Sequence, residues 1–359
     1  MRIGILTFHF AYNYGAILQA YALSTYLSKC GHDVKIINYF PDELRHLYTL
    51  NPFIVSRKKE VLAKIKKLPR CAKQFRLFEK FKANDLPCTE EISRENLSKC
   101  NNSFDVFIVG SDQVWNNRIL ADIAPYFLTF VEDNKTKISY AASFGSIDIS
   151  KEYKYSLSAY LEKFNTISVR EKEAVCLLDD VGITSVAVVD PVFLLNRKEW
   201  LSLVSNIAVS KNIKKYIFYY ILEPDAKLDE YVKSRAKEEG KVIIVVHPTC
   251  ERLSSIKEAV YLNNVGPKEF LSLLINAEIV VTNSFHATAF AAMFGIEVMN
   301  MASPKRLARS KSLIGELCHE YNPVQGEIHL LEDMVSQESV EFSAKSAKEF
   351  LDKSIKKYE

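Results

Sequence analysis

The stretch EIVVTNSFHATAFAAMFG, residues 278–295, places a histidine, His286, in a strongly apolar part of the chain. Residues 279–282 are β-branched and predict a buried parallel strand, and the small and apolar residues 287–294 predict a buried helix. In a doubly wound α/β sheet, ligands bind beyond the carboxyl ends of the strands, where the next helix presents its free N–H groups. The loop between the two elements would place three polar side chains there: Asn283, Ser284 and His286.

Two interpretations of His286 are open. Ser284 could simply cap the helix, and His286 could be a hydrogen-bonded core histidine. A strand end is the favoured place for chemistry, however, and histidine is the side chain whose unperturbed pKa lies closest to neutrality. We therefore take His286 as the main candidate for proton transfer.

The alternation of strand, loop and helix extends over most of the chain. Residues 2–8 and 33–38 predict strands on either side of a helix, and this βαβ unit indicates a parallel sheet. After a crossing at Asp190-Pro191, the pattern starts again with a strand at 216–222, which predicts a second Rossmann-like sheet. We expect an α/β protein with an N-terminal domain over residues 1–190, a C-terminal domain over 191–330, and a helical segment over 331–359 that returns toward the first domain.

The loop after the first strand, HFAYNYGA, carries further polar side chains. It lacks the G-x-G-x-x-G of a dinucleotide site and the G-K-[ST] of a P-loop, so no tightly bound pyrophosphate is expected. Asn13, Tyr14 and Gly15 look like one wall of a cleft, although a plain strand-to-helix turn explains them equally well.

Two more strand ends carry candidate residues. The stretch GSDQVWN follows a strand predicted at 105–109, and its polar residues would face a cleft. These are Ser111, Asp112, Gln113 and Asn116. Arg170 follows a strand at 165–169 and would begin the next helix. A cation at a helix N-terminus is unfavourable unless an anion is bound there, so we interpret Arg170 as an anion ligand.

The composition excludes several classes of function. The 359 residues include 47 basic and 44 acidic side chains, and this net charge of +3 is too balanced to attract nucleic acid. The seven cysteines are scattered and never form a C-x-x-C pair, so neither a zinc site nor a disulfide framework is indicated. This pattern fits a reducing cytosol.

Three segments bear on membrane contact. Residues 57–82 are basic and predict helices with a break at Pro69, which is either a solvated helix pair or a surface that docks an anionic or membrane-borne acceptor. The N-terminus MRIGILTFHF is too short and interrupted for a secretory signal, and the uncharged run 279–296 is too polar for lipid. We expect a cytoplasmic protein with at most peripheral contact with the inner face of the membrane.

Six stretches, in this order, resemble the polysaccharide pyruvyl transferase family: FHFAYNYGAILQAYAL, DVFIVGSDQVWN, YAASFG, ISVREKEAV, DPVFLL and VVTNSFHATAFAAMFG. No single motif is decisive, but six in the correct order make the resemblance specific. It implies the GT-B arrangement of glycosyltransferases, with the active cleft between two Rossmann-like domains.

Characterised members of that family move the enolpyruvyl unit of phosphoenolpyruvate onto two hydroxyls of one sugar, giving a pyruvate ketal and phosphate without a metal. The resemblance implies that His286 is the active-site histidine, and that Arg170 and Arg309 are its arginines. Protonation of the donor needs a positioned acid and fixed cations. His286 would be the acid, the two arginines would hold the anionic donor, and Asp112 is the candidate base for a sugar hydroxyl.

The expected partners are therefore phosphoenolpyruvate and a sugar acceptor, which could be lipid-linked, of a capsule or exopolysaccharide, with no cofactor. The sequence departs from several characterised members at Ser284, where they carry an arginine. One phosphate or carboxylate contact is thus either missing or supplied by Lys305 or Arg306.

Two rival functions are considered. A sugar-nucleotide glycosyltransferase of the same fold commonly carries an acidic residue in the helix after the last binding loop, but residues 287–292 read ATAFAA. A catalytically lapsed scaffold that only binds a sugar is the non-enzymatic alternative, and Ser284 is its best support.

Overall fold

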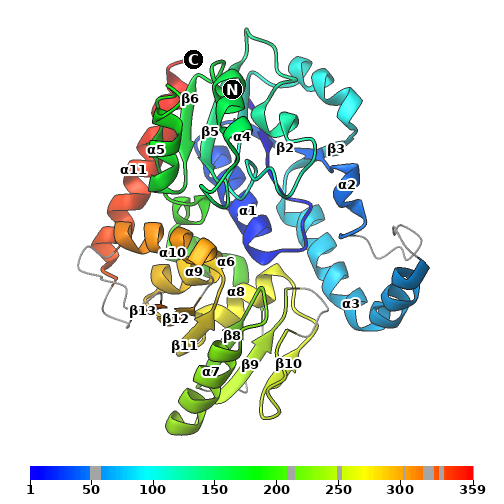
Figure 1. Ribbon diagram of the computed structural model, residues 1–359, viewed down its shortest axis with the longest axis vertical. Helices are drawn as coiled ribbons and strands as arrows, with labels where there is room; N and C mark the ends of the chain where they lie inside the picture. The colour runs from blue at the N-terminus through cyan, green and yellow to red at the C-terminus, as the bar shows by residue number, and fades with distance from the viewer. Residues whose placement is uncertain are drawn as a thin grey trace.

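The computed structural model describes residues 1–48, 58–207, 215–248, 253–301, 304–317, 327–330 and 335–358, with backbone only for 58–70, 304–308, 316, 327 and 328. These residues form two α/β units, one above the other in Figure 1, each built on its own sheet. The predicted α/β class with two parallel-sheet domains is confirmed.

Within the described residues, the first sheet has the strand order β3-β2-β1-β4-β5-β6-β7 and is parallel throughout. Its strands are β1 (Arg2–Leu6), β2 (Asp33–Tyr39), β3 (Cys88–Ile92), β4 (Val106–Val109), β5 (Thr136–Ala142), β6 (Thr166–Val169) and β7 (Val186–Ala187). The helices of this half are α1 (Tyr14–Lys29), α2 (Asp42–Arg45), α3 (Lys58–Asp85), η1 (Arg94–Asn102), η2 (Ala124–Phe127), α4 (Lys151–Leu161) and α5 (Lys172–Asp179).

The second sheet, over the described residues, has the order β10-β9-β8-β11-β12-β13, and only β13 runs antiparallel to its neighbour. Its strands are β8 (Tyr216–Tyr220), β9 (Val242–Val246), β10 (Val260–Leu262), β11 (Ile279–Thr282), β12 (Glu297–Met301) and β13 (Glu327–Leu330). The helices are η3 (Pro191–Leu194), α6 (Arg197–Val204), α7 (Ala226–Glu239), α8 (Pro267–Ile275), α9 (Phe285–Phe294), α10 (Pro304–Leu317) and α11 (Gln337–Lys356).

The central strands follow from their composition. Both β4, with the sequence VFIV, and β11, with IVVT, are buried at every position, as expected for parallel strands that helices cover on both faces. The edge strand β3 has the sequence CTEEI and is only partly covered, so it carries no apolar run by which sequence could identify it.

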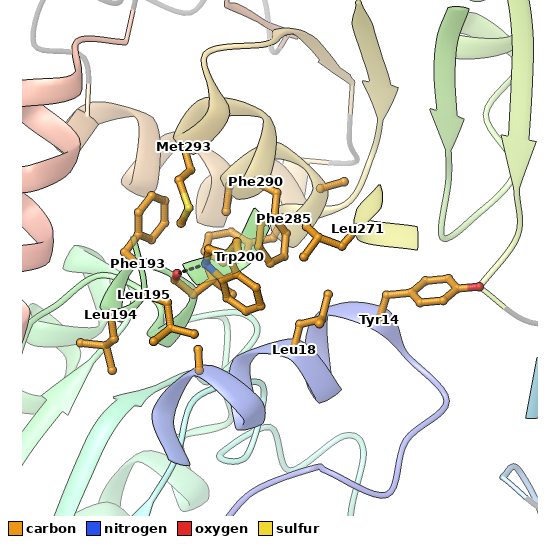
Figure 2. Close-up of a cluster of buried hydrophobic side chains, with 14 of the residues drawn as sticks. Tyr14, Leu18, Phe193, Leu194, Leu195, Trp200, Leu271, Phe285, Phe290 and Met293 are labelled. Atoms are coloured by element: carbon orange, nitrogen blue, oxygen red, sulfur yellow. Dashed lines mark hydrogen bonds between the residues drawn. The ribbon is translucent and has the colours of Figure 1, made fainter. Parts of the chain in front are cut away.

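One hydrophobic cluster connects the two units. It includes residues of both sheets and of η3, α6, α8 and α9. Figure 2 shows Trp200 of α6 at its centre, between Leu18 of α1 and Phe290 of α9. Trp200 is fully buried, its indole N–H donates to the Val192 carbonyl at 3.0 Å, and its ring meets Phe290 edge-on at 5.0 Å. The two domains therefore share a packed core.

Two long helices also cross from one unit to the other. Helix α3 packs on α8, and the Lys268 ammonium lies 2.7 Å from the Asp85 carboxylate. Helix α11 runs back along the first domain in Figure 1, where Asp352 accepts a hydrogen bond from Tyr26 of α1 at 3.0 Å. The expected return of the C-terminal helix is confirmed.

The basic segment differs from the expectation. Helix α3 continues through Pro69, so the predicted break is wrong. A proline removes one helical hydrogen bond, but packing of the following turns against the second domain holds the helix together. None of the helices in the described ranges combines the length and apolarity needed to cross a membrane.

The expectation for the cysteines is corrected at one position. Cys71 on α3 is disulfide-bonded, whereas Cys30, Cys88, Cys100 and Cys176 are free. Spacing along the sequence cannot reveal such a pair, because only the tertiary structure brings its two members together.

We predict that Trp200→Ala lowers the free energy of unfolding by about 3–5 kcal/mol, because it leaves a large cavity in the shared core. Its neighbour Leu201 is 47% exposed, and Leu201→Ala should change the same quantity by about 0.5 kcal/mol or less. Urea denaturation of both variants measures the difference. Equal stability of the two would contradict a core that joins the domains at Trp200.

Candidate active site

A cavity of about 490 Å³ lies between the two domains. The first domain lines it with Tyr12, Asn13, Tyr48, Asp112, Gln113, Asn116, Arg118, Gly145 and Ser146, and the second with Leu222, Pro248, Ser284, Phe285, His286 and Arg309. Most of these residues follow the carboxyl ends of strands β1, β4, β5, β8, β9 and β11. This is the place where α/β sheets bind ligands.

His286 lies in the first turn of α9. Ser284 is the N-cap of this helix, and its hydroxyl accepts a hydrogen bond from the Ala287 N–H at 3.4 Å. The His286 side chain is 11% exposed, and the Phe285 ring meets it edge-on at 5.2 Å. The helix N-terminus therefore holds a nearly enclosed imidazole at the cavity wall.

The N-terminus of α1 lies directly against this imidazole. Asn13 caps α1, and its side-chain oxygen accepts hydrogen bonds from the Gly15 and Ala16 N–H groups at 3.0 and 3.2 Å. A Cβ atom on Gly15 would overlap Nδ1, Cγ and Cβ of His286. Position 15 must therefore be glycine for the two domains to meet in this way.

A buried carboxylate, Asp190, lies on the other side of His286. Its Oδ2 accepts hydrogen bonds from the Ser111 hydroxyl at 2.9 Å and from Nη1 of Arg170 at 3.1 Å, and its Oδ1 accepts one from the Val192 N–H at 3.1 Å. Nε2 of His286 is 3.4 Å from Oδ2, a contact that is an ion pair only when the imidazole is protonated, and Nε2 has no hydrogen-bond partner in the described residues. We call Asp190, Ser111, Arg170 and His286 the Asp190 cluster.

Charge inside this cluster is balanced. Burial by itself raises the pKa of Asp190, but His286, Arg170 and the Val192 N–H more than offset that effect and hold the pKa well below its usual range. Asp190 is therefore a permanent anion at neutral pH, although it is completely buried.

Arg170 differs from its sequence-based interpretation. Helix α5 begins at Lys172, after Glu171 as N-cap, so Arg170 does not begin a helix. Its side chain is 2% exposed and does not line the cavity. The guanidinium is paired with Asp190 and, through Nε at 3.3 Å, with Glu171, and it lies over the Phe285 ring. The anion that neutralises Arg170 is thus part of the protein.

The polar wall of the first domain is built around a strained residue. Asp112 has φ of 80°, a left-handed conformation that is uncommon outside glycine, and its carboxylate accepts a hydrogen bond from the Gln113 N–H at 2.8 Å. The Asn116 amide donates to the Gln113 side-chain oxygen at 2.9 Å. Gly145 has no Cβ, which leaves room for these two amides.

Of the predicted site residues not yet placed, Arg309 lines the cavity, whereas Tyr14 and Asn283 do not. Tyr14 is fully buried, stacks on Phe270 of α8, and donates to the Val265 carbonyl at 2.8 Å. Asn283 ties the loop after β8, by hydrogen bonds to the Leu222 N–H and the Glu223 carbonyl. The side chains of Lys305 and Arg306 lie outside the described residues.

Sequence reasoning missed Tyr12, Tyr48, Arg118 and Asp190 as site residues. Asp190 had a usable signal, since it follows a strand-like run and begins the stretch DPVFLL, but it is interpreted there as a domain crossing and as part of a motif, not as a site residue. Among the described residues, no group of histidine, cysteine and acidic side chains could hold a metal ion.

We predict that Asp190→Asn lowers the free energy of unfolding by about 3–5 kcal/mol at pH 7, because it removes one partner of a buried ion pair. The exposed pair of Asp180 with Lys154 is the control, and Asp180→Asn should cost about 1 kcal/mol or less.

The folded-state pKa of Asp190 is depressed, so its contribution is complete above the unfolded-state value of about 3.9 and is lost as the pH falls through the lower folded-state value. The stability difference between the wild type and Asp190→Asn should thus stay constant from pH 7 to about pH 5 and shrink only in stronger acid. Urea denaturation at several pH values measures it, and a difference that disappears above pH 5 would contradict the buried anion.

Solved structures resemble this chain along almost its whole length. The UDP-GlcNAc 2-epimerase from Neisseria meningitidis, bound to UDP-GlcNAc, is 12% identical, with 98% of this chain and 100% of that chain covered and a TM-score of 0.52. The Methanocaldococcus jannaschii UDP-GlcNAc 2-epimerase, in complex with UDP-GlcNAc and UDP, is 15% identical, with coverages of 97% and 100% and a TM-score of 0.47. The E. coli ADP-heptose LPS heptosyltransferase II is 11% identical, with coverages of 98% and 99% and a TM-score of 0.39.

At such low identity the likeness concerns the fold alone, which is GT-B-like as expected. None of the curated proteins compared with the chain matches its sequence. The sequence model of the polysaccharide pyruvyl transferases, in contrast, matches residues 13–304, which include all the predicted site residues except Lys305, Arg306 and Arg309. This chain therefore belongs to the polysaccharide pyruvyl transferase family.

Proposed function

We propose that this protein transfers the enolpyruvyl unit of phosphoenolpyruvate onto a sugar of a surface polysaccharide or its precursor, forms a pyruvate ketal and releases phosphate. The observation that carries the proposal is His286, an almost enclosed imidazole at a helix N-terminus that opens on a cavity between two domains. Family membership supports the transfer to a polysaccharide. The reaction would take place in the cytoplasm, with at most peripheral membrane contact.

The second domain offers the side of the cavity that suits an anionic donor. Arg309 lines it, and α9 directs its N-terminus toward it. A guanidinium and the partial positive charge of a helix N-terminus together favour a phosphate or carboxylate. Arg170, which is paired with Asp190 and Glu171, is not needed as a direct donor ligand in this arrangement.

The first domain offers the side that suits a sugar. Gln113 and Asn116 carry amides that can donate to and accept from hydroxyl groups, and Asp112 adds a carboxylate. Asp112 is the proposed base for the attacking hydroxyl. The rings of Tyr12 and Tyr48 complete this wall and can cover an apolar sugar face.

Two side chains, His286 and Asp112, carry all the proton transfers of the proposed reaction. His286 gives a proton to the methylene carbon of the donor, and the adjacent carbon becomes an oxocarbenium-like centre. The first sugar hydroxyl adds to this centre and its proton passes to Asp112, which gives it to the departing phosphate. The second hydroxyl then closes the ketal, and its proton returns to His286. Both groups end as they began, so no cofactor is required.

We predict that His286→Gln lowers the turnover of phosphate release from phosphoenolpyruvate by about a hundred- to ten-thousand-fold, because the acid is lost. The KM for the donor should change much less. His329 lies on β13, outside the cavity lining, and His329→Gln is the matched control. Phosphate release with candidate sugar acceptors measures both.

Wild-type turnover in His286→Gln would refute the proposed acid. Release of a nucleotide from a sugar nucleotide, without phosphate release from phosphoenolpyruvate, would instead favour a glycosyltransferase. Binding of a sugar without turnover of either donor would favour a lapsed scaffold.

We further predict that Gly15→Ala lowers the same turnover by at least about tenfold, because the added methyl group displaces the imidazole by a large fraction of an ångström or more. Gly315 on α10 has open space where its Cβ would lie, so Gly315→Ala should leave turnover unchanged. If the two variants were equally active, the contact between Gly15 and His286 would not matter for the reaction.

A further inference from the structure

We propose that Asp190 is a positioning residue that fixes which ring nitrogen of His286 carries the proton. The neutral imidazole would hold its proton on Nε2, toward Asp190, and leave Nδ1 to exchange a proton with the ligand. The proton exchange between Nδ1 and the ligand rests on the proposed function, whereas the position of the proton on Nε2 does not.

The carboxylate of Asp190 cannot turn away from His286. Its Oδ1 is held by the Val192 N–H, and its Oδ2 by the Ser111 hydroxyl and by Nη1 of Arg170. Asp190 is completely buried, so bulk water does not compete for its carboxylate oxygens. A carboxylate with three fixed donors is a rigid acceptor for a fourth.

The imidazole is equally restricted. Gly15 lies against one side of the ring near Nδ1, and Phe285 meets the ring edge-on. Nε2 is buried, and Oδ2 of Asp190 lies 3.4 Å from it. A neutral Nε2 with a bare lone pair toward this anion would be repelled, so the proton belongs on Nε2.

Asp190 keeps its negative charge and does not take the proton from His286, because His286 itself, Arg170 and the Val192 N–H hold the pKa of this carboxylate low against the effect of burial. When His286 becomes an imidazolium, the contact between Nε2–H and Asp190 stabilises it. When Nδ1 gives up its proton, the Nε2–H tautomer remains and can accept a proton at the same atom again. Asp112, Arg118 and Arg309 are the other charged side chains that line the cavity beside His286 in the described residues.

This role explains why the arginine that resembles a family active-site residue is buried. Arg170 would act through Asp190 on His286 and not through the donor. The Asp190 cluster then couples β6 of the first domain, and the crossing at Asp190, to the His286 side chain of the second domain.

The test is the tautomer of His286 in the full-length wild-type protein. The chain contains seven histidines, and 15N labelling of their rings lets NMR distinguish protonated from unprotonated nitrogens. The signal that His286→Gln removes belongs to His286. At a pH where this ring is neutral, we expect the proton on Nε2. A proton on Nδ1 would overturn the inference, and this measurement needs neither substrate nor a variant at Asp190.

Asp190→Asn tests the consequence. We expect a lower population of the Nε2–H tautomer, and a turnover of phosphate release that falls about a hundred- to ten-thousand-fold with little change in the KM for phosphoenolpyruvate. Ser111→Ala keeps the carboxylate and loses one donor, so the tautomer should persist and turnover should fall about tenfold or less. Asp180→Asn is the control that should leave both readouts unchanged.

The outcomes separate the two proposals. If Ser111→Ala were as harmful to turnover as Asp190→Asn while the tautomer stayed on Nε2 in both, the effect would be a general loss of packing and the positioning role would be refuted. If the tautomer changed as expected but the wild type released no phosphate from phosphoenolpyruvate with any acceptor, the proposed function would fail and the coupling of Asp190 to His286 would stand.

Discussion

The buried ion pair between Arg170 and Asp190 is the constraint on which the site depends. Two charges without access to water are costly unless every oxygen and most N–H groups find partners, and here Ser111, Glu171 and the Val192 N–H supply them. These partners come from the ends of β4 and β6 and from η3, so the pair ties two strands of the first domain to the segment that leads into the second. His286 is the only residue of the second domain in the Asp190 cluster as described.

The domain contact is what brings His286 to that pair. GT-B folds place their active clefts between two separately folded sheets, so precision across the cleft depends on how the domains are held. In this chain the two domains are joined by the hydrophobic cluster around Trp200, by helix α3 on one side and by helix α11 on the other. Interdomain interfaces that are large and hydrophobic favour one fixed arrangement. The close approach of Gly15 to His286 is consistent with such a fixed arrangement.

The cavity walls differ in chemical character, and this difference follows from the strands that supply them. The first domain contributes amides, a carboxylate, tyrosines and Arg118, whose guanidinium is paired with Asp148, whereas the second contributes a helix N-terminus, His286 and Arg309. Neutral polar groups suit a sugar, and positive potential suits an anionic donor. The left-handed backbone of Asp112 adds strain on the sugar side, which a structure retains only where the surroundings hold it.

The sequence by itself determined the features that depend on local order. Apolar runs predicted the central strands, a helix cap was one of the two interpretations of Ser284, and strand ends pointed to Asp112, Ser284 and His286, which line the cavity, because side-chain period and helix capping are properties of neighbouring residues. Only the tertiary structure decided that Arg170 is paired inside the protein, that Asp190 meets His286, and that Tyr14 packs between the domains. It also decided that β3 pairs at a sheet edge and that α3 continues through Pro69. The physical reason is that burial and charge pairing depend on which distant segments the domain contact brings together, and no local pattern encodes that.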